Sequence, residues 1–112
     1  SDVISFHNYS DTNSLKKAID SLQKTGRPVI CTEYMARTNN SKFITHLPVF
    51  KRTHVGAINW GLVSGKSNTI FPWESKEGSP EPNPWFHDIF RKDGTAFDKK
   101  EVEIIKQLTG KK

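Results

Sequence analysis

Three short apolar runs divide the chain into units of similar layout. They cover residues 3–6, 28–32 and 55–60, and each ends on polar or aromatic residues. Their length and near-continuous hydrophobicity are typical of parallel strands that are buried on both faces. The pattern therefore predicts three strands, each with polar or aromatic side chains at its carboxyl end.

Between and after these runs, apolar residues recur at the spacing of one helix face. Three such stripes occur: Leu15, Ala18, Ile19 and Leu22; Phe43, Leu47 and Phe50; and Val102, Ile105 and Leu108. A side-chain oxygen just before a helix can accept the free N–H groups of the first turn. The expected caps are Asn13 or Ser14, then Ser41, and finally Asp98 in a capping box with Glu101.

Proline and glycine mark where these patterns break. Pro48 predicts either a kink in the second helix or a later start with the proline in its first turn. Residues 62–96 are rich in Gly, Pro and Ser and are expected to form a long loop. Within it, residues 84–90 are expected to form a short helix that begins near Pro84.

The expected elements follow the order β-α-β-α-β-loop-α. Strands that alternate with helices indicate an α/β fold with a parallel sheet. The units span residues 3–26, 28–54 and 55–110 of one domain, residues 1–112. Such folds place their functional sites at the carboxyl ends of the strands, in open sheets and in barrels alike.

The composition narrows the possible functions. The chain has 112 residues, 34% of them hydrophobic, and 17 Lys and Arg against 12 Asp and Glu, a net charge of +5. The basic residues are scattered and do not alternate with stacking aromatic residues, so no nucleic-acid site is expected. No apolar run approaches the ~20 residues of a membrane helix, and residues 1–5 lack the features of a secretion signal. With a single cysteine and no metal-ligand spacing among the histidines, neither a metal nor a cofactor is expected.

The strand ends carry the candidate chemistry. Glu33 follows a buried strand, where a carboxylate is costly unless it is paired, hydrogen-bonded or part of a site. His7 and Tyr9 lie two residues apart in an extended segment and point to the same side, so Tyr9 can bind a carboxylate and His7 a substrate hydroxyl. Trp60 ends the third run, and an indole face suits the C–H face of a sugar ring. Trp73, in the long loop, could line a groove.

Each of these residues also has a structural explanation. Glu33 could be a surface residue or the partner of Arg37, and the histidine and tyrosine of the first tip could satisfy loop backbone. The two tryptophans could belong to the core or anchor the loop. Trp85 is expected to pack the loop, and Cys31 to be a small core residue.

Four segments together resemble a known family. They are Ser-Phe-His-Asn-Tyr (5–9), Val-Ile-Cys-Thr-Glu-Tyr-Met-Ala-Arg (29–37), Ala-Ile-Asn-Trp-Gly-Leu-Val-Ser-Gly-Lys (57–66) and Trp-Phe-His-Asp-Ile-Phe-Arg-Lys-Asp-Gly-Thr (85–95). In order and spacing they resemble the last three βα units of a retaining clan A glycoside hydrolase, a cellulase- or xylanase-like (β/α)8 TIM barrel. The resemblance covers essentially the whole chain. It implies a partial TIM barrel of three parallel βα units with a long loop before the last helix.

The resemblance also implies roles for the residues at the strand ends. Glu33 corresponds to the catalytic nucleophile, Tyr9 to the residue that hydrogen-bonds it, and His7 to the companion of that tyrosine. Trp60 corresponds to the platform under the sugar at the cleavage site, and Trp73 is placed with the substrate-binding residues. The implied substrate is a plant-type polysaccharide, a β-1,4-glucan, xylan or mannan. The implied location is extracellular or periplasmic.

One part of the family pattern is missing. The general acid/base of the family is the Glu of an Asn-Glu pair after strand four, and this chain contains no Asn-Glu pair. A complete barrel needs eight strands and ~250 residues. We therefore expect the C-terminal portion of a β-glycosidase, inactive alone, that binds a missing N-terminal barrel half or self-associates. The alternatives are a non-catalytic carbohydrate-binding module and a flavodoxin-like interaction domain.

Overall fold

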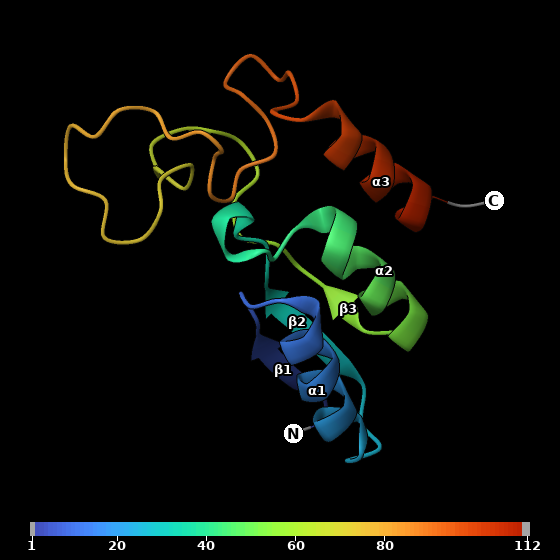
Figure 1. Ribbon diagram of the computed structural model, residues 1–112. Helices are drawn as coiled ribbons and strands as arrows, with labels where there is room; N and C mark the ends of the chain where they lie inside the picture. The colour runs from blue at the N-terminus through green and yellow to red at the C-terminus, as the bar shows by residue number, and fades with distance from the viewer. Residues whose placement is uncertain (1, 111–112) are drawn as a thin grey trace.

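The computed structural model describes residues 2–110, which form three parallel strands and three α-helices (Figure 1). In chain order the elements are β1 (Ile4–His7), α1 (Thr12–Gln23), β2 (Val29–Glu33), the 3-10 turn η1 (Arg37–Asn39), α2 (Phe43–Thr53), β3 (Gly56–Ala57) and α3 (Lys99–Thr109). The α/β class and the parallel sheet predicted from the sequence are confirmed.

The strands lie side by side in chain order, β1-β2-β3, and each is parallel to the next. Ile4 pairs with Val29, and Phe6 pairs with Cys31, which in turn pairs with Ala57. Neighbours in a parallel ladder point to the same face, so these five side chains share one face. In the described sheet, the order lacks the reversal at which a doubly wound sheet changes direction. This order disfavours the flavodoxin-like alternative.

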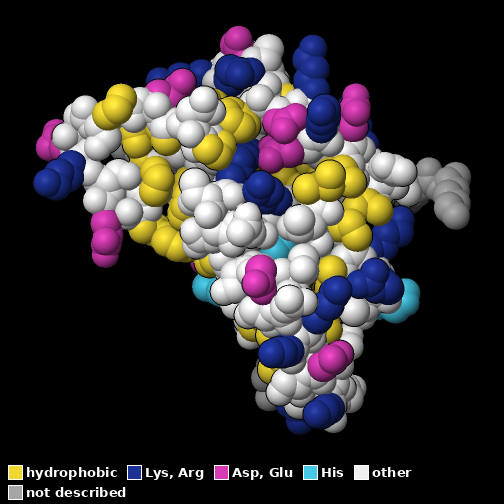
Figure 2. All heavy atoms as spheres, in the orientation of Figure 1, with side chains coloured by type: hydrophobic (Ala, Val, Ile, Leu, Met, Phe, Trp, Pro, Cys, Tyr) yellow, Lys and Arg dark blue, Asp and Glu magenta, His cyan; other side chains and the backbone are white. Residues whose placement is uncertain are grey.

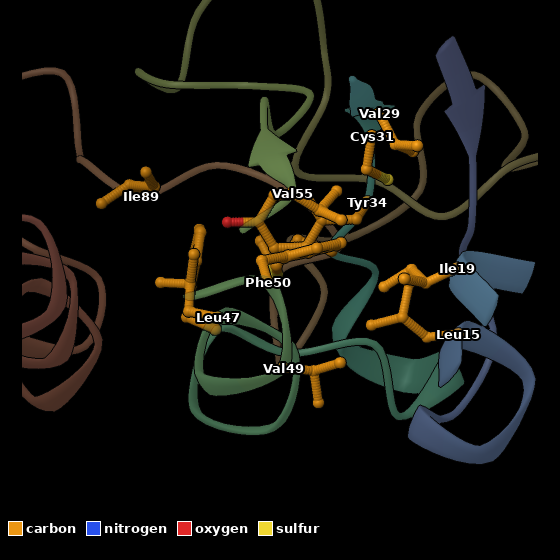
Figure 3. Close-up of a cluster of buried hydrophobic side chains, with 12 residues drawn as sticks. Leu15, Ile19, Val29, Cys31, Tyr34, Leu47, Val49, Phe50, Val55 and Ile89 are labelled. Carbon is orange, nitrogen blue, oxygen red and sulfur yellow. The ribbon is translucent and has the colours of Figure 1, made fainter. Parts of the chain in front are cut away.

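Both α1 and α2 pack on that one face. Leu15 and Ile19 of α1 and Phe50 of α2 join Val29 and Cys31 of β2 in one buried cluster (Figure 3). Burial of an aliphatic or aromatic side chain of this size contributes about 1.5–3 kcal/mol. This cluster therefore holds the two helices to the sheet.

The opposite face of the sheet is uncovered. On it, Ser5 and Gly56 are exposed, Ile30 and Thr32 are half-buried, and Ile58, just beyond β3, is 55% exposed. The expectation that the strands are covered on both faces is therefore wrong for the part of the chain that the structure describes. The radius of gyration is 14.9 Å, against about 13 Å for a compact domain of this length. The three units form an open layer.

Strand β3 is shorter than predicted. Only Gly56 and Ala57 form a ladder with β2, although the Ile58 N–H still donates to the Cys31 carbonyl over 2.8 Å. In the described sheet β3 has a neighbour on one side only, so no second ladder holds residues 59–60 extended. Trp60 consequently lies beyond the strand rather than at its end.

The short helix predicted at residues 84–90 is absent from the structure. Phe86, His87 and Ile89 donate their backbone N–H groups to the carbonyls of Ile70, Thr69 and Leu62. A helix would direct those N–H groups to carbonyls four residues earlier. Instead, residues 62–70 of the long loop fold back against residues 84–90 and accept these hydrogen bonds.

Two of the expected helix caps are replaced. The carboxylate of Asp11, not Asn13 or Ser14, caps α1 by accepting the N–H of Ser14 over 3.0 Å. The Ser41 hydroxyl accepts the N–H of Met35 over 3.1 Å, so it supports the turn after β2 rather than α2. Helix α1 begins at Thr12, one residue before the first expected cap, whereas Ser41 is diverted to another backbone N–H.

Two further boundaries are partly as predicted. Asp98 caps α3, but Glu101 does not complete the capping box because its carboxylate binds Arg37. Pro48 is the sixth residue of α2, which begins at Phe43, so a later helix start is wrong. The proline removes one backbone donor, which the buried face of α2 offsets.

His46 on α2 makes the stability of the fold depend on pH. The side chain is 0% exposed, with Nε2 2.8 Å from the Ser10 carbonyl and Nδ1 2.8 Å from the Thr45 hydroxyl. A carbonyl oxygen only accepts, so Nε2 carries the proton of the neutral ring. Burial lowers the pKa of His46, although the Ser10 carbonyl and the charge of Asp11 oppose that shift.

A lower pKa in the folded state means that the unfolded chain binds protons more readily. The free energy of unfolding should therefore fall as the pH drops below about 6.5, the pKa of an unperturbed histidine. We expect the urea midpoint to be lower at about pH 5.5 than at about pH 7.5, with a smaller difference in His46→Gln. A part of the difference should persist there, because burial also lowers the pKa of His87. Equal midpoints at both pH values in the parent chain would contradict this prediction.

Candidate functional site

The candidate site lies at the carboxyl ends of β1 and β2. The ladder shifts register between Phe6 and His7, so that His7 pairs with Glu33. The Asn8 N–H donates to the Glu33 carbonyl over 2.9 Å, and Tyr9 follows directly. This backbone bond holds the two strand ends together and brings the three predicted polar side chains to one place.

The two carboxylate oxygens of Glu33 differ in their surroundings. Oε2 accepts a hydrogen bond from the Tyr9 hydroxyl over 2.8 Å and lies 3.4 Å from His7 Nδ1. Within residues 2–110, Oε1 has no hydrogen-bond partner. The side chain is 26% exposed. One oxygen is therefore held in place while the other remains available to a ligand.

Tyr9 is held as a hydrogen-bond donor. Burial, the hydrogen bond to Glu33 and the negative charge of Glu33 all raise the pKa of Tyr9, so the phenol keeps its proton at neutral pH. The ring meets Trp73 edge-on, with 5.0 Å between centroids, and lies 5.6 Å from the ring of His87. These contacts link the strand-end site to the long loop.

The backbone turns sharply just after Glu33. Met35 has a φ of 77°, in the left-handed region that residues other than glycine rarely adopt. Its N–H donates to Ser41, and its carbonyl accepts a hydrogen bond from His87 Nδ1 over 2.7 Å. Such a conformation costs about 1–3 kcal/mol and persists only where the surrounding contacts hold it.

Arg37 fastens the long loop and α3 to the end of β2. The side chain is 5% exposed. Its guanidinium forms a bidentate ion pair with Glu101 at 2.6 and 2.9 Å, and it also donates to the carbonyls of Trp85 and Asp88. The partner of Arg37 is thus Glu101 on α3, so the structural alternative in which Arg37 pairs with Glu33 does not hold.

A cavity of about 670 Å³ lies beside the Glu33 site, among residues 67–79 of the loop. Trp60, Trp73 and His87 line it, and the two tryptophans are 50% and 56% exposed. Figure 2 shows hydrophobic side chains at the surface of this loop, at the upper left of the view. Glu33 does not line the cavity. Trp73, which packs on Tyr9, connects the two.

The predicted site residues therefore fall into two groups. The structure brings His7, Tyr9 and Glu33 into direct contact, and Trp73 reaches them through Tyr9. Among the described residues, Trp60 forms neither a hydrogen bond nor a ring contact with these side chains. It joins them only across the cavity that it shares with Trp73.

Trp85 and Cys31 have the structural roles expected of them. Trp85 is 3% exposed and stacks on Phe97 with 4.7 Å between centroids. Cys31 is 0% exposed, and burial raises the pKa of its thiol to about 11. A thiol with so high a pKa is protonated at neutral pH and is a poor nucleophile.

Comparisons with protein-family models, curated proteins and solved structures give no match for this chain. Residues 2–110 contain no group of three or more His, Cys, Asp or Glu that could hold a metal ion. None of the helices described has both the length and the apolar character needed to cross a membrane. The function is therefore inferred from the geometry of the site.

Proposed function

We propose that the chain is the C-terminal portion of a retaining β-glycosidase with a (β/α)8 barrel, in which Glu33 is the nucleophile. One observation carries this proposal. The carboxylate stands at the carboxyl end of a parallel strand, with Oε2 bonded to Tyr9 and Oε1 without a partner among the described residues. Barrel enzymes build their sites at this edge of the sheet, and a retaining glycosidase needs a positioned carboxylate there.

In the proposed reaction, Oε1 of Glu33 attacks the anomeric carbon while the bond to the leaving oxygen breaks. A second carboxylic acid protonates that oxygen, and its carboxylate then takes a proton from the water that hydrolyses the glycosyl-enzyme. The Tyr9 hydroxyl fixes the orientation of the nucleophile through Oε2. His7 offers its imidazole to a substrate hydroxyl, and Trp60 offers an indole face to the sugar ring.

The second carboxyl group is assigned to another part of the barrel. It must lie about 5–5.5 Å from the nucleophile in a retaining enzyme. Among residues 2–110, Glu101 is committed to Arg37, and Glu74, Glu77 and Glu81 are exposed on the long loop. None of these glutamates has a fixed position beside Glu33.

The uncovered surfaces of the sheet support a partner for this chain. Within the described residues, β1 and β3 each have a neighbouring strand on one side only, and open edges of this kind readily pair with further strands. Ile30 and Ile58 lie on the uncovered face. In the proposal, an N-terminal barrel half covers this face and supplies the missing strands, and self-association is the alternative.

The proposed substrate is a plant-type polysaccharide, a β-1,4-glucan, xylan or mannan, acted on outside the cell or in the periplasm. Trp60 and Trp73 support a sugar ligand, because both indoles are about half exposed at one concave surface. Exposed indoles suit the C–H faces of pyranose rings.

The proposal predicts that the 112-residue chain alone does not hydrolyse an activated aryl β-glycoside. The same chain joined to a barrel half that carries the acid/base should hydrolyse it. The chain alone lacks the acid/base and also lacks half of the substrate cleft. Both are needed to stabilise the transition state. The measurement is the release of the aryl alcohol over time. Full activity of the chain alone would contradict a split site.

A non-catalytic carbohydrate-binding module is the second candidate function. The observation in its favour is the aromatic-lined cavity, which does not include Glu33. The two functions differ in what they require of Glu33. If the chain is a binding module, Glu33→Gln still binds sugar, and neither the variant nor the parent chain shows turnover. If it is part of a glycosidase, Glu33→Gln abolishes the turnover of the complete enzyme.

A further inference from the structure

We propose that the part of the cavity lined by Trp73 and His87 is a sugar-binding subsite next to the cleavage site, where Trp60 remains the platform, with His87 as its hydrogen-bond acceptor. This inference rests on the proposed function for its ligand class, one unit of a neutral β-1,4-linked oligosaccharide. It adds a residue, His87, that the strand ends do not supply.

His87 has one ring nitrogen fixed and one free. Nδ1 lies 2.7 Å from the Met35 carbonyl, which can only accept, so the proton of the neutral ring is on Nδ1. Burial lowers the pKa of His87, which favours this neutral form. The other nitrogen, Nε2, is then an acceptor with a free lone pair.

The free nitrogen is not closed off by the surrounding protein. Among the described residues, every side-chain nitrogen or oxygen that is closed to solvent has a hydrogen-bond partner. Nε2 of His87 has none within those residues, so it must be accessible although the residue is only 2% exposed. His87 lines the cavity, and a ligand hydroxyl there would satisfy the acceptor.

The cavity has the size and lining of a small-ligand site. Its volume of about 670 Å³ falls within the ~300–1,000 Å³ usual for such sites. The lining combines two half-exposed indoles and the buried acceptor of His87 with polar residues of the loop. A sugar needs both kinds of group, because its ring has an apolar face and hydroxyl edges. Glu74, Lys76 and Glu77 also line the cavity, so the charges there do not favour an anionic ligand.

The position of the cavity suits an extended chain of sugars. Trp73 lines the cavity and also contacts Tyr9, which holds Glu33. A ligand whose first unit lies at Glu33 could therefore place a further unit against Trp73 and His87.

Two substitutions of His87 separate its two nitrogens. In His87→Asn the side-chain amide can still donate to the Met35 carbonyl, but nothing replaces Nε2. In His87→Gln the longer side chain can reach the position of Nε2 but not that of Nδ1. His54→Asn is the matched control, because His54 is an exposed histidine with a φ of 58°, which asparagine tolerates.

The test is calorimetric titration of the folded 112-residue chain with β-1,4-linked xylo- and cello-oligosaccharides of increasing length. We expect affinity to rise with length, to fall about fivefold in His87→Asn, and to fall further in Trp73→Ala. Affinity should be recovered in part in His87→Gln and unchanged in His54→Asn. The fluorescence of the two exposed tryptophans should change on binding.

Three results would overturn the subsite. They are no binding of any length to the folded chain, no dependence on length, and equal affinity of His87→Asn and the parent chain. Each leaves the role of Glu33 to be decided separately, because that role is measured by turnover of an aryl glycoside too short to reach His87. Conversely, length-dependent binding that requires His87, together with unchanged turnover in Glu33→Gln, would support the subsite and reject the nucleophile.

Discussion

Glu33→Gln, in the complete barrel that the proposal requires, is expected to lower the turnover of an activated aryl β-glycoside by about 10⁴-fold or more. Glutamine has nearly the same shape as glutamate, and its amide oxygen can still accept the Tyr9 hydroxyl, which lies 2.8 Å from Oε2 in the parent chain. A neutral amide is a far weaker nucleophile than a carboxylate. The loss should therefore appear in the chemical step and not in the fold.

The matched control for this prediction is Glu103→Gln. Glu103 is an exposed glutamate on α3, so the same chemical change there should leave turnover unchanged. Both variants should unfold at the urea concentration that unfolds the parent protein. If Glu33→Gln keeps more than about a tenth of the parental rate while remaining folded, a covalent role for Glu33 is excluded.

Arg37→Met is expected to destabilise the chain by about 3–5 kcal/mol, since it leaves the mostly buried carboxylate of Glu101 without its cation. The side chain of Arg37 is 4% exposed and that of Glu101 is 12% exposed. The carbonyls of Trp85 and Asp88 lose a charged donor in the same variant. A loss of this size is a large fraction of the ~5–15 kcal/mol that holds a typical domain together.

Urea unfolding of the purified chain measures this effect. Arg52→Met is the matched control, because Arg52 is exposed in the last turn of α2, and it should shift the unfolding free energy by less than about 0.5 kcal/mol. Arg37→Met combined with Glu101→Leu should recover much of the loss, because no unpaired charge then remains buried. Equal midpoints for Arg37→Met and the parent chain would show that the ion pair does not fasten α3 and the loop.

The strands and helices of the three units were predictable because their signals are local. Each apolar run or stripe depends on residues within one element, as with Leu15 and Ile19 on α1, and packing on one sheet face then follows. The failures concern contacts between distant residues. The helix expected at residues 84–90 competes with hydrogen bonds to the carbonyls of residues 62–70, which no local pattern reveals.

The site was predictable to a similar degree. Glu33, His7 and Tyr9 were identified because residues that end neighbouring parallel strands meet at one edge. His87 and the Arg37–Glu101 pair were missed, since each depends on how the long loop folds back over the end of β2. Neither a half-buried glutamate on a helix nor a buried histidine in a loop has a sequence signal comparable to a strand end.

The central claim is that the Glu33 carboxylate forms a covalent bond to the sugar. An activated 2-deoxy-2-fluoro-β-glycoside tests it directly, because the fluorine slows both steps through the oxocarbenium-like transition state while the good leaving group preserves the first. After digestion of the trapped complete barrel, mass spectrometry should locate the glycosyl group on the peptide that contains Glu33. A glycosyl group on any other residue, or steady turnover by an enzyme that never accumulates an adduct, would contradict this account.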